Sequence, residues 1–157
     1  MAGLIARYGR LPAWAAFALS LALLWLGLWV IGLFEAGAEY APADVDLRAQ
    51  WREAPWLVSG VLLVVPVLQV LLFQTLTIEG LRRVTARGWP GWVASVLAYG
   101  PVLHWDSGTI VVVAATWVGA VFASTYLAQR AQEAMRASVM AAGLQVVFAS
   151  SVLWLPA

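Results

Sequence analysis

A chain of 157 residues in which 63% are hydrophobic and only 11% are charged has too little charge to cover the surface of a water-soluble domain. Its formal net charge of +1 excludes the broad basic field of a nucleic-acid-binding protein, and the lack of cysteine excludes disulfides and thiolate metal sites. The excess of apolar residues is instead typical of a chain that places its surface in lipid.

The apolar residues fall into five stretches, which predict an all-α, polytopic transmembrane helical bundle built as a single domain over residues 1–157. A helix needs roughly 20 residues to cross a hydrocarbon core of ~30 Å. Four stretches are long enough, and the first is too long for a signal-peptide core. The third is interrupted by Gly100-Pro101 and is predicted to be short or broken. The predicted spans are residues 11–34, 56–78, 92–104, 109–127 and 137–155.

Arginines in the connecting segments predict the orientation of these spans. Three arginine-bearing segments alternate with a mainly acidic first outer loop and a short turn after the third span. Because positively charged segments stay on the cytoplasmic side, the N-terminus is predicted inside and the C-terminus outside, in a bacterial inner membrane. The ten tryptophans fit the interfacial belts of such a multi-pass protein. The orienting arginines are Arg7, Arg10, Arg82, Arg83, Arg87, Arg130 and Arg136.

Two structures remain open for the first outer loop. Asp44 could cap a short helix that ends at Glu53 and lies on the outer surface of the bilayer. The alternative is an ordered but irregular loop.

Small residues at four-residue spacing predict how the last two spans pack. Because lipid provides no hydrophobic attraction between helices, close backbone contact must hold them together. The two small-residue stripes are expected to face each other in an antiparallel hairpin, and Pro66 is expected to kink the second span. The stripes are Ala115, Gly119 and Ala123 in the fourth span and Ser138 and Ala142 in the fifth.

Polar side chains inside the predicted spans are few and informative. Gln69, Gln74 and Gln145 are expected to form hydrogen bonds between helices, and the alternative is that they line the path of a small-molecule carrier. No Asp, Glu, Lys or Arg lies clearly inside a predicted span, which disfavours a proton pump, a carboxylate-driven transporter or a voltage sensor.

Two residues are candidates for chemistry. His104 ends the third span and could be the fifth ligand of a haem or a chlorophyll-type pigment, with Asp106 orienting its ring, or simply an interfacial histidine. Glu79, near Arg82 and Arg83, could belong to a catalytic cluster or to the solvated end of the second span. Because they are predicted on opposite sides of the membrane, Glu79 and His104 could not share a water. No metal site is predicted.

The last two-thirds of the chain resembles the CPBP family of glutamic intramembrane proteases, which are related to CAAX-processing enzymes. The resemblance implies a shared helical scaffold, in which paired glutamates, helped by histidines, would activate a water. It is carried by Phe73-Gln74 with Glu79-Gly-Leu-Arg82-Arg83 and Gly88-Trp89-Pro90-Gly91-Trp92, by Ser95 to His104, and by Trp117 to Tyr126 before the last span.

The first catalytic motif of that family does not carry over. Aligned on Phe73-Gln74, its glutamate pair falls on Gln69 and Val70, and its arginine falls on Gln74. Aligned on Glu79 and Arg83, its first glutamate falls on Ile78.

The other two motifs keep a single match. Tyr99 lies five residues before His104, where the family has phenylalanine four before, and Ala141 and Gln145 replace the family's histidine and asparagine. Amides and one imidazole provide no base to take a proton from water. The resemblance therefore implies the scaffold without the activity.

These observations predict a non-catalytic accessory or scaffolding subunit of a larger inner-membrane complex. Its partners would be the lipid bilayer and other membrane protein subunits, with no nucleic acid and no expected cofactor. The alternatives are a divergent CPBP-type protease that depends on Glu79 or His104, and a haem- or pigment-binding subunit through His104.

Overall fold

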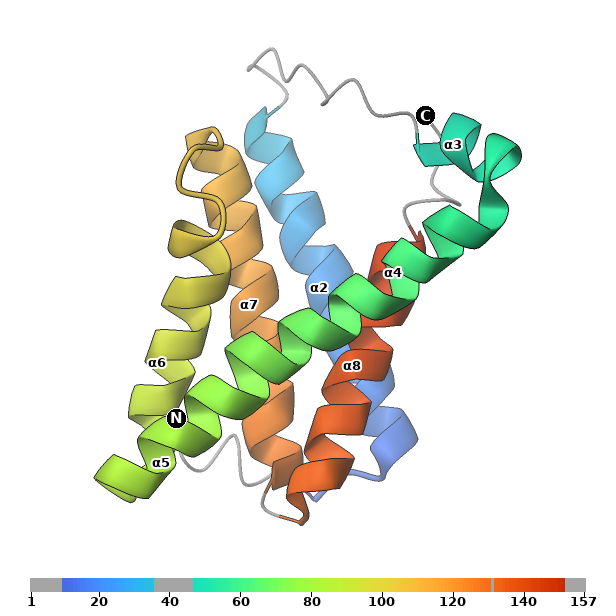
Figure 1. Cartoon of the computed structure of the whole chain (residues 1–157). Helices are drawn as coiled ribbons and strands as arrows, with labels where there is room; N and C mark the ends of the chain where they lie inside the picture. Colours follow the sequence, from blue (N-terminus) through green and yellow to red (C-terminus); the bar gives the residue numbers. More distant parts are fainter. Residues whose placement is uncertain (1–9, 36–46, 131, 152–157) are drawn as a thin grey trace.

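The computed structural model describes residues 10–35, 47–130 and 132–151, and every regular element within these ranges is a helix (Figure 1). The prediction of an all-helical chain is therefore confirmed for this part of the sequence. Arg7, Asp44 and the last residues of the predicted fifth span lie outside the described residues.

Among the described residues, three helices are long and apolar enough to cross a membrane. They are Ala13–Gly32 within α2 (Ala13–Glu35), the composite helix Pro55–Thr85, and α7 (Thr109–Arg130). They correspond to the first, second and fourth predicted spans. A chain with three such helices has the character of a membrane protein.

The composite helix changes its geometry along its length. It consists of α4 (Pro55–Gln69), the π-helix η1 (Val70–Leu76) and α5 (Thr77–Thr85), which follow one another as a single rod in Figure 1. Pro55 begins α4, where its missing amide proton costs nothing. Pro66 lies inside α4, and the departure from α geometry begins four residues later, at Val70.

The third and fifth predicted spans are shorter helices. The third comprises α6 (Trp89–Leu97) and a π-helical turn, η2 (Ala98–Val102), so Gly100-Pro101 lies within a widened turn. Together these segments reach ~20 Å, less than the thickness of a hydrocarbon core. The fifth is α8 (Ala134–Ser151). In the loop predicted to lie outside, between the first two predicted spans, α3 (Leu47–Glu53) shows that the helical alternative is correct for these residues.

Helix α7 is the centre of the bundle. It packs against α2, α6 with η2, and α8, while the composite helix crosses α8 and α6 (Figure 1). Hydrogen-bonded hydroxyls of Ser20 and Thr125, 2.9 Å apart, join α2 to α7, and the Trp92 indole donates to Ser124 across 3.0 Å to join α6 to α7.

Glycines allow two close helix crossings. A Cβ added to Gly91 of α6 would lie 2.8 Å from the Ile78 Cα, and one added to Gly100 would lie 2.6 Å from the Thr116 Cα. Larger residues at these positions would push the helices apart. Backbone contact between small residues is how helices associate where lipid removes the hydrophobic drive.

The small-residue stripes of the last two spans pack partly against each other and partly against other elements. Gly119 faces the Tyr99 side chain in η2, and the Ser138 hydroxyl lies 3.0 Å from that of Thr75 in η1. Ala115 is buried. Ala123 lies in a core cluster with Ala137 and Ala141 of α8, with Ala142 packed against it. The two helices are neighbours, but Gly119 and Ser138 do not face each other.

Candidate functional site

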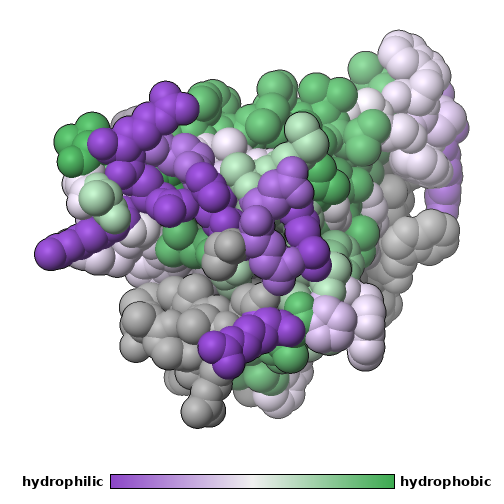
Figure 2. Space-filling view, turned by 90° about the horizontal axis from the view of Figure 1, so that it is seen from below, coloured by the Kyte–Doolittle hydropathy of each residue, from purple (hydrophilic) through white to green (hydrophobic). Residues whose placement is uncertain are grey.

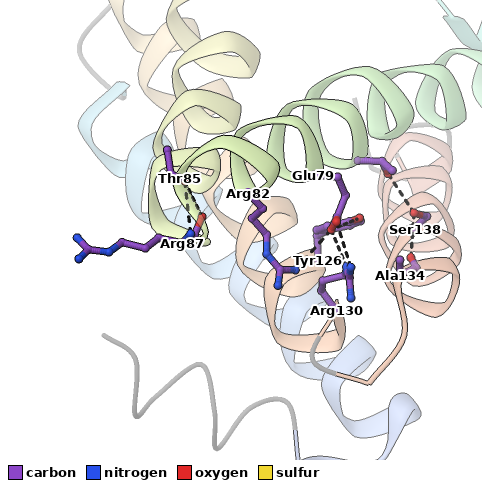
Figure 3. Close-up of polar contacts among 9 residues, drawn as sticks. Glu79, Arg82, Thr85, Arg87, Tyr126, Arg130, Ala134 and Ser138 are labelled. Carbon is purple, nitrogen blue, oxygen red and sulfur yellow. Dashed lines mark hydrogen bonds and ion pairs between the residues drawn. The ribbon is translucent and has the colours of Figure 1, made fainter.

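The strongest polar cluster joins α5 to α7 around Glu79 (Figure 3). The Arg130 guanidinium donates to both carboxylate oxygens, with Nε 2.6 Å from Oε1 and an Nη nitrogen 3.1 Å from Oε2. The Tyr126 hydroxyl donates to Oε1 across 3.1 Å, and Arg82 lies 3.6 Å from the same oxygen. We call Glu79, Tyr126 and Arg130 the carboxylate clamp.

Helical spacing explains why this clamp forms. Tyr126 and Arg130 lie four residues apart on α7, so both side chains project from one face toward α5. The Glu79 and Arg130 side chains are 22% and 30% exposed, so the pair is partly shielded from water. Two-point hydrogen bonding by arginine fixes the orientation of a carboxylate as well as balancing its charge.

The Glu79 carboxylate in the clamp serves to join helices. Both oxygens of Glu79 already accept hydrogen bonds, and a cation balances the charge. A general base needs an oxygen within reach of the proton that it removes, and here both oxygens already accept hydrogen bonds from α7. The adjacent pair of Thr75 and Ser138 extends the same link to α8.

Sequence reasoning missed two members of the clamp. It grouped Glu79 with Arg82 and Arg83, but the partner that binds it is Arg130, 51 residues away in the chain. Arg83 is exposed and forms no ion pair with any described residue. One sequence feature could have indicated the clamp. Tyr126 and Arg130 are four residues apart, and they are predicted on the same side of the membrane as Glu79.

A second polar cluster lies inside the bundle. Gln145 is 2% exposed, and its amide donates to the side-chain oxygen of Gln69 and, across 3.2 Å, to the Tyr99 hydroxyl. Gln74 does not join them. It is fully buried, and its amide has no hydrogen-bond partner among the described residues. The same holds for Gln129 of α7, which the sequence did not single out.

His104 follows η2 at the opposite end of α6 from Glu79. Its backbone amide donates to the Gly100 carbonyl, and its ring centre lies 6.4 Å from that of Tyr99. Within the described chain, Asp106 is exposed and forms no hydrogen bond with the histidine. The described residues also contain no group of three His, Cys, Asp or Glu that could hold a metal ion.

Most of the described arginines gather at one end of the bundle, whereas α3, which contains Arg48 and Arg52, lies at the other end. The end with most arginines is the one where α2 begins, α5 and α7 finish and α8 begins, at the bottom of Figure 1. Figure 2, seen from below, shows hydrophilic residues across this end. The turn with His104 lies at the opposite end, and the ~20 Å of α6 and η2 separate it from Glu79. The arginines described at this end are Arg10, Arg82, Arg83, Arg87, Arg130 and Arg136.

No family model, no curated protein and no solved structure matches this chain. The resemblance to the CPBP family therefore stays a prediction from the motifs.

Proposed function

We propose that this chain is a non-catalytic accessory or scaffolding subunit of a larger complex in the bacterial inner membrane. The pairing of Glu79 with Arg130 and Tyr126 carries the proposal, because it commits the carboxylate best placed for chemistry to holding helices together. In the Gln69–Gln145–Tyr99 cluster, the amide groups likewise hold helices together.

In this proposal the chain crosses the bilayer five times, with its N-terminus inside and its C-terminus outside. The collection of six arginines at one end of the bundle supports this orientation through the positive-inside rule. The short α6–η2 segment would cross by local thinning of the bilayer and by burial against α5 and α7.

The separation of His104 from Glu79 supports a role without proteolysis. A water shared by an imidazole and a carboxylate requires both groups within hydrogen-bond reach, and ~20 Å of helix lies between them. The proximity of the Tyr99 ring to His104 gives that histidine a packing role at the end of η2.

Helix α4 offers the surface for a membrane partner. Among its side chains only Val58 and Pro66 are buried, and the large apolar residues around them are exposed. A helix with apolar residues on all sides and few contacts within its own chain is suited to contact lipid and neighbouring membrane helices.

Affinity purification in a mild detergent, followed by mass spectrometry of the co-purifying proteins, tests the proposal. Wild-type protein and the His104→Ala variant are expected to retain the same membrane partners in the same amounts. Purification of the wild-type chain without a partner in every mild detergent would contradict the proposal.

Two further measurements on the same preparations separate the alternatives. The scaffold proposal expects no absorbance band beyond the tryptophan region, and a visible band lost in His104→Ala would favour the pigment-binding alternative. Cleavage of a membrane-anchored peptide by wild-type protein but not by His104→Ala would favour the protease alternative.

A further inference from the structure

The turn between α5 and α6 carries arginines that the carboxylate clamp leaves free. We call residues 83–89 the arginine corner. Arg83 and Arg87 are exposed, and neither forms an ion pair with a described residue. The nearest acidic side chain along the chain, Glu79, is already bound by Arg130. The two guanidinium groups are therefore available to an external anion.

The geometry of the corner turns Arg87 outward. Ala86 adopts a left-handed conformation, with φ of 54°, which ends α5. Thr85 fixes the turn, because its hydroxyl accepts from the Arg87 amide across 3.4 Å and has two carbonyl acceptors for its one proton, that of Leu81 at 2.8 Å and that of Arg87 at 3.2 Å. The Arg87 side chain points away from the bundle in Figure 3.

Large apolar side chains are exposed beside these arginines. Val84 is 84% exposed and Trp89 is 61% exposed. Water alone is a poor environment for both. The headgroup region of a bilayer suits the combination, because indole rings lie there and guanidinium groups meet phosphates.

The position of the arginine corner along the composite helix agrees with a location in the headgroup region of the bilayer. Leu76, seven positions before Arg83, is a large exposed apolar residue on the part of the helix expected to face lipid chains. Seven residues of helix rise about 10 Å. The headgroup layer beyond each side of the hydrocarbon core is roughly 5–8 Å thick, so arginine side chains at residues 83 and 87 reach its phosphates.

We infer that the arginine corner is a binding surface for anionic phospholipid headgroups. Arg83 and Arg87 bind the phosphate groups, for which the flat, multiply donating guanidinium is well suited. Trp89 and Val84 lie at the boundary between headgroups and acyl chains. The inference requires that the chain is embedded in a bilayer, and it is independent of the proposed partner complex.

Native mass spectrometry of the purified full chain, offered equal amounts of phosphatidylglycerol and phosphatidylcholine, tests this inference. Wild-type protein is expected to retain the anionic lipid preferentially. Each arginine near an anionic surface contributes about fivefold in affinity, so Arg83→Gln with Arg87→Gln is expected to remove most of the preference. Arg52→Gln at the opposite end is the matched control and is expected to keep it.

Additional variants and ligands separate lipid binding from a folding defect, a free-anion site and a protein contact. Replacement of both arginines by lysine is expected to retain the preference, which separates loss of charge from loss of fold. Equal retention of both lipids by wild-type protein, or an unchanged preference in the double glutamine variant, would overturn the inference. Displacement of the lipid by inorganic phosphate at matched ionic strength would identify a free-anion site instead. Loss of a protein partner, with an unchanged lipid preference, would reassign the surface to protein contact.

Discussion

The indole of Trp117 on α7 occupies the space in which a side chain at Gly27 of α2 would begin. An ideal Cβ at Gly27 would lie 1.9 Å from the Trp117 Nε1 atom. The same nitrogen donates a hydrogen bond to the Leu23 carbonyl across 3.1 Å. A tryptophan N–H in an apolar environment needs such a partner, so the glycine both admits the ring and lets its donor be satisfied.

Gly27→Ala is expected to destabilise the protein by about 1–3 kcal/mol, because the indole must move and lose its acceptor. Unfolding in detergent, followed by tryptophan fluorescence, measures the effect. Gly32→Ala on the same helix is the matched control, because a Cβ there meets nothing within 4 Å. Equal effects of the two substitutions would show that the Trp117 contact does not constrain α2.

Arg130→Gln is expected to destabilise the fold by about 1–3 kcal/mol, because Glu79 then loses the donor that binds both of its oxygens. A double-mutant cycle with Glu79→Gln isolates the pair and should give a coupling energy above about 0.5 kcal/mol. Arg83→Gln, which removes an exposed arginine without an ion pair among the described residues, should leave the unfolding transition nearly unchanged. Additive effects of the two clamp substitutions would count against the clamp.

Gln74→Leu is expected to be neutral or stabilising, whereas Gln145→Leu should cost about 1 kcal/mol. The Gln74 amide is buried without a partner among the described residues, and such a group carries its full desolvation penalty. The Gln145 amide joins Gln69 and Tyr99, a contact of the strength usual between membrane helices. Unfolding of the two variants in detergent under identical conditions compares their stabilities. A larger loss of stability for Gln74→Leu than for Gln145→Leu would contradict this prediction.

Cysteine labelling tests the orientation of the bundle. The natural chain has no cysteine, so each introduced thiol is the sole target of a membrane-impermeant maleimide. We expect Asp106→Cys to react from outside intact cells and Gln132→Cys to react only after the membrane is opened. Both positions are exposed, so burial cannot explain a difference between them. Labelling of both from outside would contradict the proposed orientation.

The helical segments could be predicted from the sequence because a helix that crosses lipid needs a long apolar run. Most arginines could be assigned to one end of the bundle because charged residues mark the ends of such runs. The predicted span 56–78 matches a helix that in the structure continues from Pro55 to Thr85. Its extension past Glu79 was hidden by the polar composition of α5, since charged residues that end a span in the sequence can still continue a helix.

Contacts between distant helices could not be predicted in the same way. The sequence marks Glu79 and Arg130 as charged residues at the ends of two helices, but only the angle at which α5 crosses α7 brings them together. The same limit applies to Gly119, whose stripe position does not reveal that it faces Tyr99. Periodicity identifies the face of a helix, whereas packing decides which neighbour meets that face.

The widened turns of Val70–Leu76 allow the composite helix to tolerate the deletion of a residue, which its α-helical parts do not. Loss of one residue from an α-helix rotates everything beyond it by about 100°, which would swing Glu79 away from α7. A π-helical turn holds a surplus residue, so a deletion there can be absorbed by a return to ordinary pitch. Chain length in this helix is therefore most free to vary at the segment just before Glu79, the residue that binds Arg130.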